Sequence, residues 1–321
     1  MAHFESVTFG GVGFDRAAEL RGDDTKMAAI KRDRESRSIV FWRGKPLVSG
    51  EGDKELVLLE LDHSIFEHAA EEPIFLGRGE EGCLFAQDIS AWEPMNQDTP
   101  DGSFLDQTEQ HYPGFPADQA FSELRTIMTR LSDRDAELCA MTRSLLSWHA
   151  THRFCSKCGA ESHIDESGWR RRCDTCSALH FPRTDPVVIM LVTQGNSVLV
   201  GRSPGWPDGM FSLLAGFLEP GETPEAAVRR EVFEEAGIRV GAVEYLGSQP
   251  WAFPSSLMLG FHAEALGTEI TLDPVELEDA IWMTREEVML AFSGEHPRVR
   301  RPRNGAIAHF ILKNWLEDCL D

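Results

Sequence analysis

The stretch Gly216–Ile238, GFLEPGETPEAAVRREVFEEAGI, combines the start and stop signals of a helix with a high density of negative charge. Thr223 offers a capping hydroxyl, Pro224 suits the first helical position, and Gly237 suits the residue that ends a helix. These signals predict a helix over 224–236. Against only two arginines, the stretch carries six carboxylates: Glu219, Glu222, Glu225, Glu231, Glu234 and Glu235.

Three of these carboxylates share one face of the predicted helix. Glu231, Glu234 and Glu235 stand at positions i, i+3 and i+4, and at about 100° per residue they lie side by side. Like charges this close repel one another unless a cation neutralises them, and magnesium and manganese prefer such oxygen ligands. A solvated acidic face is the alternative, and it would be favoured if the helix stood alone.

Four cysteines form two CxxC pairs separated by fourteen residues: Cys155, Cys158, Cys173 and Cys176. Each pair offers two sulfurs from one tight turn, as in tetrahedral thiolate zinc sites. Protein ligands would fill all four positions, which predicts one structural zinc per chain. Unrelated thiols and a redox CxxC motif are weaker alternatives at this spacing. The basic segment WRRRC could bind nucleic acid, although a structural module with a solvated edge is favoured.

The acidic stretch resembles the Nudix box, G-x5-E-x7-R-E-U-x-E-E-x-G-U, where U is a bulky aliphatic residue. The resemblance implies a Nudix fold, a mixed sheet between helices, and hydrolysis of a nucleoside diphosphate linked to another group. It also implies that the three clustered glutamates hold metals and that Arg230 and Glu222 pair to brace the loop. Every fixed position is filled, by Gly216, Glu222, Arg230, Glu231, Val232, Glu234, Glu235, Gly237 and Ile238.

A second motif, SQPWAFPSSLM at Ser248–Met258, resembles the SQPWPFPxS signature of the NADH pyrophosphatase family of Nudix enzymes. It departs at Ala252, where proline is usual, and this loss is expected to make the loop less stiff. The order of segments also matches, because a four-cysteine ribbon, the junction HFPRTDP, the box and the signature follow one another. The resemblance covers about 150–321, and the N-terminal region only by position.

This resemblance implies a dinucleotide pocket. Phe181 stands where tyrosine is common, so its ring could stack on a base without a hydroxyl hydrogen bond, and Phe217 is a second stacking candidate. The alternative for the aromatic residues of the signature is an ordinary place in the core. The loop residues implied to line the pocket are Gln249, Pro250, Trp251, Ala252, Phe253, Pro254, Ser255 and Ser256.

The resemblance also extends the metal site beyond the box. Ala215 would offer its backbone carbonyl to a metal, Glu276 matches a further acidic ligand position, and Ala308 matches a backbone contact near the substrate. The implied ligands of magnesium or manganese are therefore Ala215, Glu231, Glu234, Glu235 and Glu276.

The chain of 321 residues is long enough for several domains. Short apolar segments at 38–49, 54–62 and 81–90 predict strands, and 121–154 shows two helical patterns broken near Ser132. The expected fold class is α+β, a Nudix α/β/α sandwich with a zinc ribbon and a strand-rich N-terminal domain. The expected domains are the strand-rich domain (1–118), a helical connector (119–150), the zinc ribbon (151–183) and the Nudix catalytic domain (184–321).

The net charge of −22 argues against generic binding to nucleic acid or anionic membranes through bulk charge, although it leaves room for a local basic patch. No apolar run reaches the length of a membrane span, and the N-terminus lacks the pattern of a signal peptide. An odd total of seven cysteines, four of them in CxxC pairs, predicts a reducing compartment, and we expect a cytoplasmic protein.

The sequence therefore predicts a zinc-containing, magnesium- or manganese-dependent hydrolase that cleaves NADH or NAD to nicotinamide mononucleotide and AMP. The resemblance also implies a homodimer and activity on NAD-capped RNA. Two alternatives are a general hydrolase of nucleoside diphosphates such as ADP-ribose, and a non-catalytic ligand sensor joined to a nucleic-acid-binding ribbon. The complete set of box glutamates disfavours the sensor. The arginines of HPRVRRPRNG (296–305) form either a solvated loop or a contact with RNA phosphates.

Overall fold

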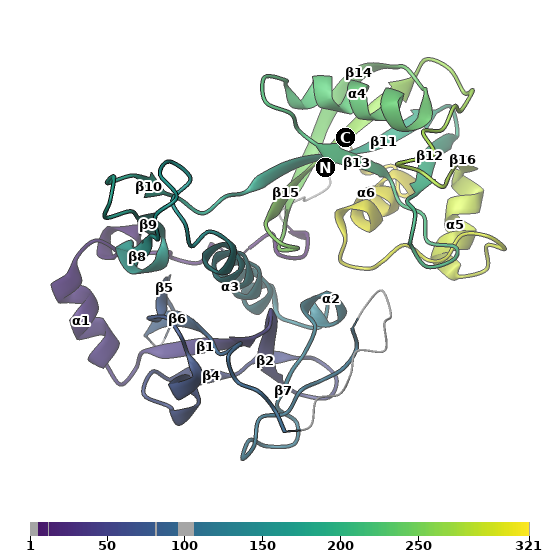
Figure 1. Cartoon of the computed structure of the whole chain (residues 1–321). Helices are drawn as coiled ribbons and strands as arrows, with labels where there is room; N and C mark the ends of the chain where they lie inside the picture. The colour runs from purple at the N-terminus through teal and green to yellow at the C-terminus, as the bar shows by residue number, and fades with distance from the viewer. Residues whose placement is uncertain (1–5, 12, 81, 96–105, 321) are drawn as a thin grey trace. The chain divides into compact units, whose positions relative to one another are not determined.

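The computed structural model describes residues 6–11, 13–80, 82–95 and 106–320 (Figure 1). The chain divides into two compact units. The first contains the N-terminal segment up to Gly10, Thr184–Trp251 and the chain from Ser256 onward. The second contains Gly11–Arg183 together with Ala252–Ser255. The first ten residues thus belong to the unit that is built mainly from the C-terminal part of the chain. Ala252–Ser255 belong to the unit that is built mainly from the N-terminal part.

The first unit is built on a six-stranded mixed sheet with the order β14-β15-β11-β12-β16, in which β13 also pairs with β11. The central strand β11 runs parallel to β15 and antiparallel to β12 and β13. The strands are β11 (Asp185–Gln194), β12 (Ser197–Arg202), β13 (Leu214–Phe217), β14 (Val240–Trp251), β15 (Ser256–Ala265) and β16 (Asp279–Thr284).

Helices cover both faces of this sheet. Helix α4 (Pro224–Ala236) lies on one face, and α5 (Arg285–Ser293) and α6 (Ile307–Leu316) lie on the other (Figure 1). Each face buries its own apolar cluster, because side chains alternate across a strand. The predicted α/β/α sandwich is confirmed.

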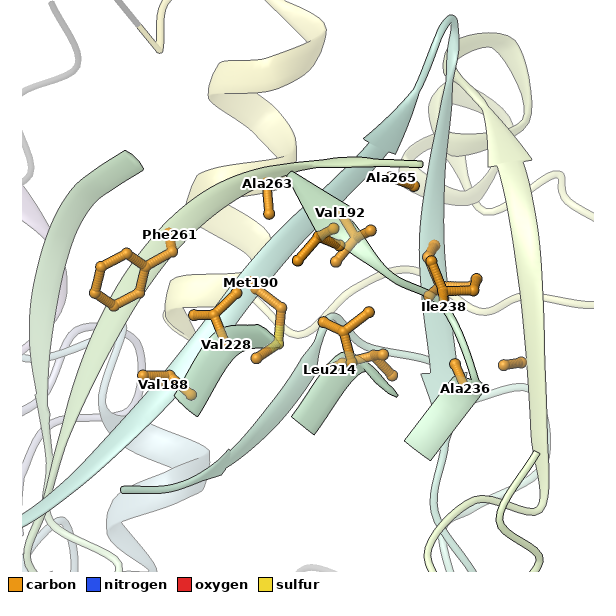
Figure 2. Close-up of a cluster of buried hydrophobic side chains, with 14 of the residues drawn as sticks. Val188, Met190, Val192, Leu214, Val228, Ala236, Ile238, Phe261, Ala263 and Ala265 are labelled. Atoms are coloured by element: carbon orange, nitrogen blue, oxygen red, sulfur yellow. The ribbon is translucent and has the colours of Figure 1, made fainter. Parts of the chain in front are cut away.

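Strand β11 shows the alternation most clearly. Val188 and Met190 point into the cluster beneath α4, where Figure 2 shows them facing Val228. Ile189 and Leu191 pack in the opposite cluster with α5 and α6. A strand that is apolar on both faces reads as a continuous hydrophobic run, as PVVIMLV does.

The second unit contains a seven-stranded sheet with the order β3-β2-β1-β6-β5, with β4 paired to β1 and β7 to β2. The predicted segment 38–49 is a hairpin, in which Arg43 and Gly44 both have positive φ, as a type I′ turn requires. The strand-rich N-terminal prediction is confirmed. The strands are β1 (Arg37–Trp42), β2 (Lys45–Ser49), β3 (Glu55–Leu56), β4 (Leu58–Glu60), β5 (Ile74–Arg78), β6 (Cys83–Asp88) and β7 (Ala120–Phe121).

The same unit holds a three-stranded sheet with the order β10-β9-β8. The predicted helix break is confirmed, because the Ser132 hydroxyl caps the long helix by accepting from the Asp135 N–H at 3.1 Å. No helix of the described chain is long and apolar enough to cross a membrane. The elements are α1 (Asp24–Arg32), α2 (Leu124–Ile127), α3 (Asp133–Thr151), β8 (His163–Asp165), β9 (Arg170–Arg172), β10 (Leu179–His180) and the 3-10 turns Ala18–Leu20, Ser64–His68 and Glu166–Gly168.

Candidate active site

Helix α4 begins and ends where its sequence signals place it. The Thr223 hydroxyl accepts a hydrogen bond from the Ala226 N–H at 3.3 Å. Pro224 is the first helical residue, and Gly237 ends the helix with a φ of 70°. The predicted helix is therefore confirmed, and packing of its apolar side against the sheet fixes the direction of its carboxylates.

Three carboxylates converge at this helix. Ligand oxygens of Glu231, Glu235 and Glu276 all lie within 4.8 Å of one another. The first two are buried on α4, whereas Glu276 is exposed on the segment that precedes β16. Glu235 Oε2 is buried and has no hydrogen-bond partner among the described residues. Such an orphaned oxygen is costly unless an ion or a ligand completes its surroundings.

Two glutamates of this cluster have raised pKa values, because they are buried close to other carboxylates. Burial, and after it the charges of Glu231, Glu276 and Glu234, raise the pKa of Glu235 to about 8. Burial also raises the pKa of Glu231, although Arg230 opposes the shift. A divalent cation bound by these carboxylate oxygens would offset both the burial of their negative charge and their mutual repulsion. The donor set and the orphaned oxygen therefore fit a divalent metal site.

In the metal-free protein, we expect Glu235 to contribute a loss of stability as pH rises from about 5 to about 8. Because the pKa of Glu235 is raised in the folded state, the unfolded chain loses this proton first, and higher pH favours unfolding. Glu235→Gln should remove much of this slope, a difference on the order of a few kcal/mol between the two pH values.

The measurement is urea unfolding at both pH values without magnesium or manganese. A chelator is omitted because it would also strip zinc. Glu225→Gln, on the first turn of the same helix, is the matched control. Equal pH slopes in parent and Glu235→Gln chains would contradict the burial of an uncompensated carboxyl group.

Arg230 links the helix to the loop before it. Its guanidinium donates to Glu222 at 2.5 Å and to the Phe217 carbonyl at 3.0 Å. It also donates to Glu231 at 2.8 Å and to Glu234 at 3.0 Å. The expected pair between Arg230 and Glu222 is present. Glu234 lies outside the converging set and is held by Arg230 instead.

Gly216 leaves room for the cluster. A Cβ at this position would lie 1.9 Å from Cδ of Glu231, so any side chain would displace that carboxylate. Its neighbour Ala215 is exposed in β13, opposite Ile189 of β11. The first fixed position of the box is thus glycine because a carboxylate packs against the backbone there.

Gln249, the first of the residues implied to line the pocket, makes structural hydrogen bonds. Gln249 is buried, and its Nε2 donates to the carbonyls of Thr8 and Gly305, both at 2.8 Å. Its Oε1 accepts from the Ile307 N–H at 2.7 Å. Gln249 therefore joins the N-terminal segment to the start of α6, a role that the sequence analysis did not foresee.

The other predicted pocket residues are distributed over both units. Phe217 is 60% exposed in the first unit, and Phe181 is 62% exposed in the second. Ala308 is buried in the core beneath α6, on the face of the sheet opposite α4. Within the first unit, Pro250 and Trp251 end β14, and the buried Ser256 begins β15. Ala252, Phe253, Pro254 and Ser255 belong to the second unit.

The four ribbon cysteines lie together in the second unit. Cys155 Sγ is 3.6 Å from Cys176 Sγ, and Cys158 Sγ is 3.6 Å from Cys173 Sγ. All four sulfurs fall within 4.8 Å of one another. Four thiols converging from two knuckles fit a tetrahedral structural zinc. His180 Nε2, at 3.3 Å from Cys155 Sγ, orients that sulfur from β10.

Two arginines of WRRRC are used inside the protein. Arg170 pairs with Asp165 at 2.7 Å. Arg171 is buried, where it donates to the Ser162 hydroxyl at 3.0 Å and meets His149 Nδ1 at 3.2 Å. This segment therefore ties the ribbon to α3, and of the three arginines only Arg172 is exposed.

Three family models match consecutive parts of the chain. They are described as an NADH pyrophosphatase-like rudimentary NUDIX domain (35–148), an NADH pyrophosphatase zinc ribbon domain (150–181) and a NUDIX domain (182–302). The match to the ribbon model agrees with the geometry of the four cysteines, and together they assign a structural zinc.

Curated relatives carry the same combination of names. Human "NAD-capped RNA hydrolase NUDT12" is 40% identical over 81% of this chain, which spans about half, 55%, of that protein. "NAD-capped RNA hydrolase NudC" of Mycobacterium bovis is 34% identical over 95% of this chain and 93% of its own length. Human "NAD(P)H pyrophosphatase NUDT13, mitochondrial" is 33% identical over 93% of this chain and 89% of its own length.

Proposed function

Because the chain belongs to the NADH pyrophosphatase family of Nudix hydrolases, we propose that it hydrolyses the diphosphate of NADH or NAD to nicotinamide mononucleotide and AMP. The observation that carries this proposal is the carboxylate cluster on α4 with its orphaned Glu235 oxygen. Magnesium or manganese is the cation proposed there, since both take hard oxygen ligands and bind diphosphate oxygens.

Each residue of the site has a proposed part. Glu231, Glu235 and Glu276 would hold the metal with the carbonyl of Ala215, and Glu234 would join them on release from Arg230. Such a metal neutralises diphosphate charge and acidifies bound water. Arg230 keeps the preceding loop in place through Glu222 and the Phe217 carbonyl. The exposed ring of Phe217 offers a stacking surface for a base or nicotinamide.

The finer assignments remain part of the proposal. Phe181 and the loop Gln249–Ser256 would complete the dinucleotide pocket, with Ala308 contributing a backbone contact, and a homodimer would build the pocket partly across its interface. NAD-capped RNA is proposed as a second substrate because two similar proteins are named for it. The cytoplasm is proposed as the location because four cysteines kept as thiolates need a reducing compartment.

A direct test compares NADH, NAD and ADP-ribose side by side with magnesium or manganese. Chromatography of the products should show AMP together with nicotinamide mononucleotide from the two dinucleotides. Cleavage of ADP-ribose with intact NADH would replace the proposal with a general nucleoside-diphosphate hydrolase. Absence of hydrolysis of all three by zinc-loaded protein would contradict catalysis.

The arginines at 298–303 supply a separate prediction about RNA. Arg298 pairs with Asp279, whereas Arg300 and Arg301 are exposed and have no carboxylate within 4.0 Å among the described residues. If they hold RNA phosphates, changing both to Ala should lower hydrolysis of NAD-capped RNA several-fold and reduce the salt slope by roughly 1 to 2.

Hydrolysis of free NADH should stay unchanged in this double variant. Arg229→Ala, an exposed arginine on the outer side of α4, is the matched control. Equal effects on RNA and NADH, or none, would assign Arg300 and Arg301 to the solvated surface.

A further inference from the structure

Arg202 is the last residue of β12, and its guanidinium joins two loops of the first unit. Its Nε donates to Glu278 Oε2 at 2.8 Å. Its Nη2 donates to the Trp206 carbonyl at 2.6 Å, and its Nη1 donates to the Pro207 carbonyl. Asp208, at 3.8 Å from Nη2, is almost fully exposed and adds little. Each nitrogen of the guanidinium therefore has an acceptor, and the Arg202 side chain is only 13% exposed.

The contact with Glu278 fixes one end of the segment that carries Glu276. Glu278 stands two residues after Glu276, the exposed member of the carboxylate cluster. The backbone adds a second contact, because the Glu278 N–H donates to the Arg202 carbonyl at 2.8 Å. Arg202 also lies opposite Asp279 in the pairing of β12 with β16. Arg202 thus holds this segment where it enters the sheet.

The other end of the segment is attached to α4. The Asp273 N–H donates to the Glu235 carbonyl at 3.1 Å, and the Leu277 N–H donates to the Asp273 carbonyl at 2.9 Å. The Leu277 side chain is buried in the apolar cluster beneath α4. Glu276 therefore sits in a short turn that is attached to α4 at its start and to Arg202 at its end.

Glu276 depends on this turn for its place. Glu231 and Glu235 are buried on α4, where the helix backbone fixes them. Glu276 is exposed, and among the described residues no Lys, Arg or His nitrogen lies within 4.0 Å of its carboxylate. Without a bound cation, the negative charges of the cluster repel one another. The two attachments of the turn therefore hold Glu276 against this repulsion.

We propose that Arg202 is a positioning residue, which keeps Glu276 within reach of the bound cation by holding Glu278. The proposal rests on the proposed function, in which Glu276 is a metal ligand. Binding sites need their ligands held to within about 0.5 Å. Without the guanidinium, the turn keeps its attachment to α4 but loses a charge-assisted contact at its other end. Glu276 would then yield to the repulsion, and the cation would lose a ligand.

The test measures the binding of manganese to the zinc-loaded chain by calorimetry, without substrate. Arg202→Gln should weaken manganese binding about tenfold, the lower end of the range for groups that orient metal ligands. Glu278→Ala breaks the same contact from its other side and leaves both carbonyl contacts of Arg202 in place. It should weaken binding by a similar factor. The double variant should be no weaker than either single variant, because both changes remove one interaction.

A second comparison separates positioning from a general effect on the fold. Glu276→Gln should itself weaken manganese binding, and Arg202→Gln added to it should cause no further loss, because the ligand that it positions is already gone. An arginine that only stabilises the fold would add its own loss in both backgrounds. Arg285→Gln is the matched control, because Arg285 pairs with Asp318 at 2.7 Å from α5, on the opposite face of the sheet. It should bind manganese as the parent does.

Thermal unfolding of each metal-free variant is recorded beside the titrations. If Arg202→Gln does not fold, Glu278→Ala decides the outcome alone. Parent affinity in Arg202→Gln and Glu278→Ala, or losses that add to that of Glu276→Gln, would overturn the positioning role and leave the proposed function intact. Parent affinity in Glu276→Gln would instead remove Glu276 from the metal ligands, and the proposed site would fail together with the role of Arg202.

Discussion

Glu235→Gln is expected to lower turnover of NADH on the order of 100-fold or more, by analogy with other losses of electrostatic stabilisation. Glu235 is the buried member of the cluster with an orphaned oxygen, so the amide removes both a negative charge and a metal ligand. The folded protein should survive, because glutamine has the same shape and ends the repulsion from Glu231 and Glu276. Activity and stability should therefore change in opposite directions.

Steady-state hydrolysis and metal-free thermal unfolding are the two measurements. Glu231→Gln should behave similarly, because it shares the cluster. Glu234→Gln should also lower turnover, but its half-exposed carboxylate is paired with Arg230, so we expect a smaller loss. Glu225→Gln on the same helix is the control and should keep near-parent turnover. A Glu235→Gln chain with parent activity would rule out the carboxylate cluster as the metal site.

The features that the sequence predicts correctly are either local in the chain or part of one motif. The cap at Thr223 and the stop at Gly237 are chain neighbours of α4, so the helix could be bounded correctly. Glu276 was found only through family resemblance, because its approach to α4 is a long-range contact. The sequence does not predict the strand β5 (Ile74–Arg78), because its apolar run IFLGR is short. Pairing with β6 holds this segment in the sheet.

Contacts between residues that are distant in sequence leave no local sequence pattern. Arg125 and Arg143 sit on helices predicted from periodicity, where each would pass for a solvated residue. In the folded chain both guanidinium groups lie over the ring of Phe253, which is remote in sequence. The same holds for Gln249, whose partners Thr8 and Ile307 lie near opposite ends of the chain. Contacts of this kind depend on tertiary packing, which carries no local periodicity.

Cys173→Ser is expected to remove the tightly bound zinc, about one ion per chain, and to lower stability by several kcal/mol. Cys173 is fully buried, with its sulfur 3.6 Å from that of Cys158. The ribbon strands have only three, three and two residues, so the ribbon has little apolar surface to hold it together without metal. Loss of one thiolate should therefore open the whole ribbon.

The effect on chemistry should come second to the effect on folding. The carboxylate cluster lies in the other compact unit, so the soluble fraction of Cys173→Ser should keep much of its turnover per folded molecule while its yield and unfolding temperature fall. Cys319→Ser, at an exposed cysteine outside the ribbon, is the matched control for the sulfur-to-oxygen change. Zinc content is measured by elemental analysis beside thermal unfolding. A zinc-free parent whose stability equals that of Cys173→Ser would refute the site. If Cys173→Ser instead kept the parent stability but lost turnover, the zinc would have a catalytic rather than a structural role.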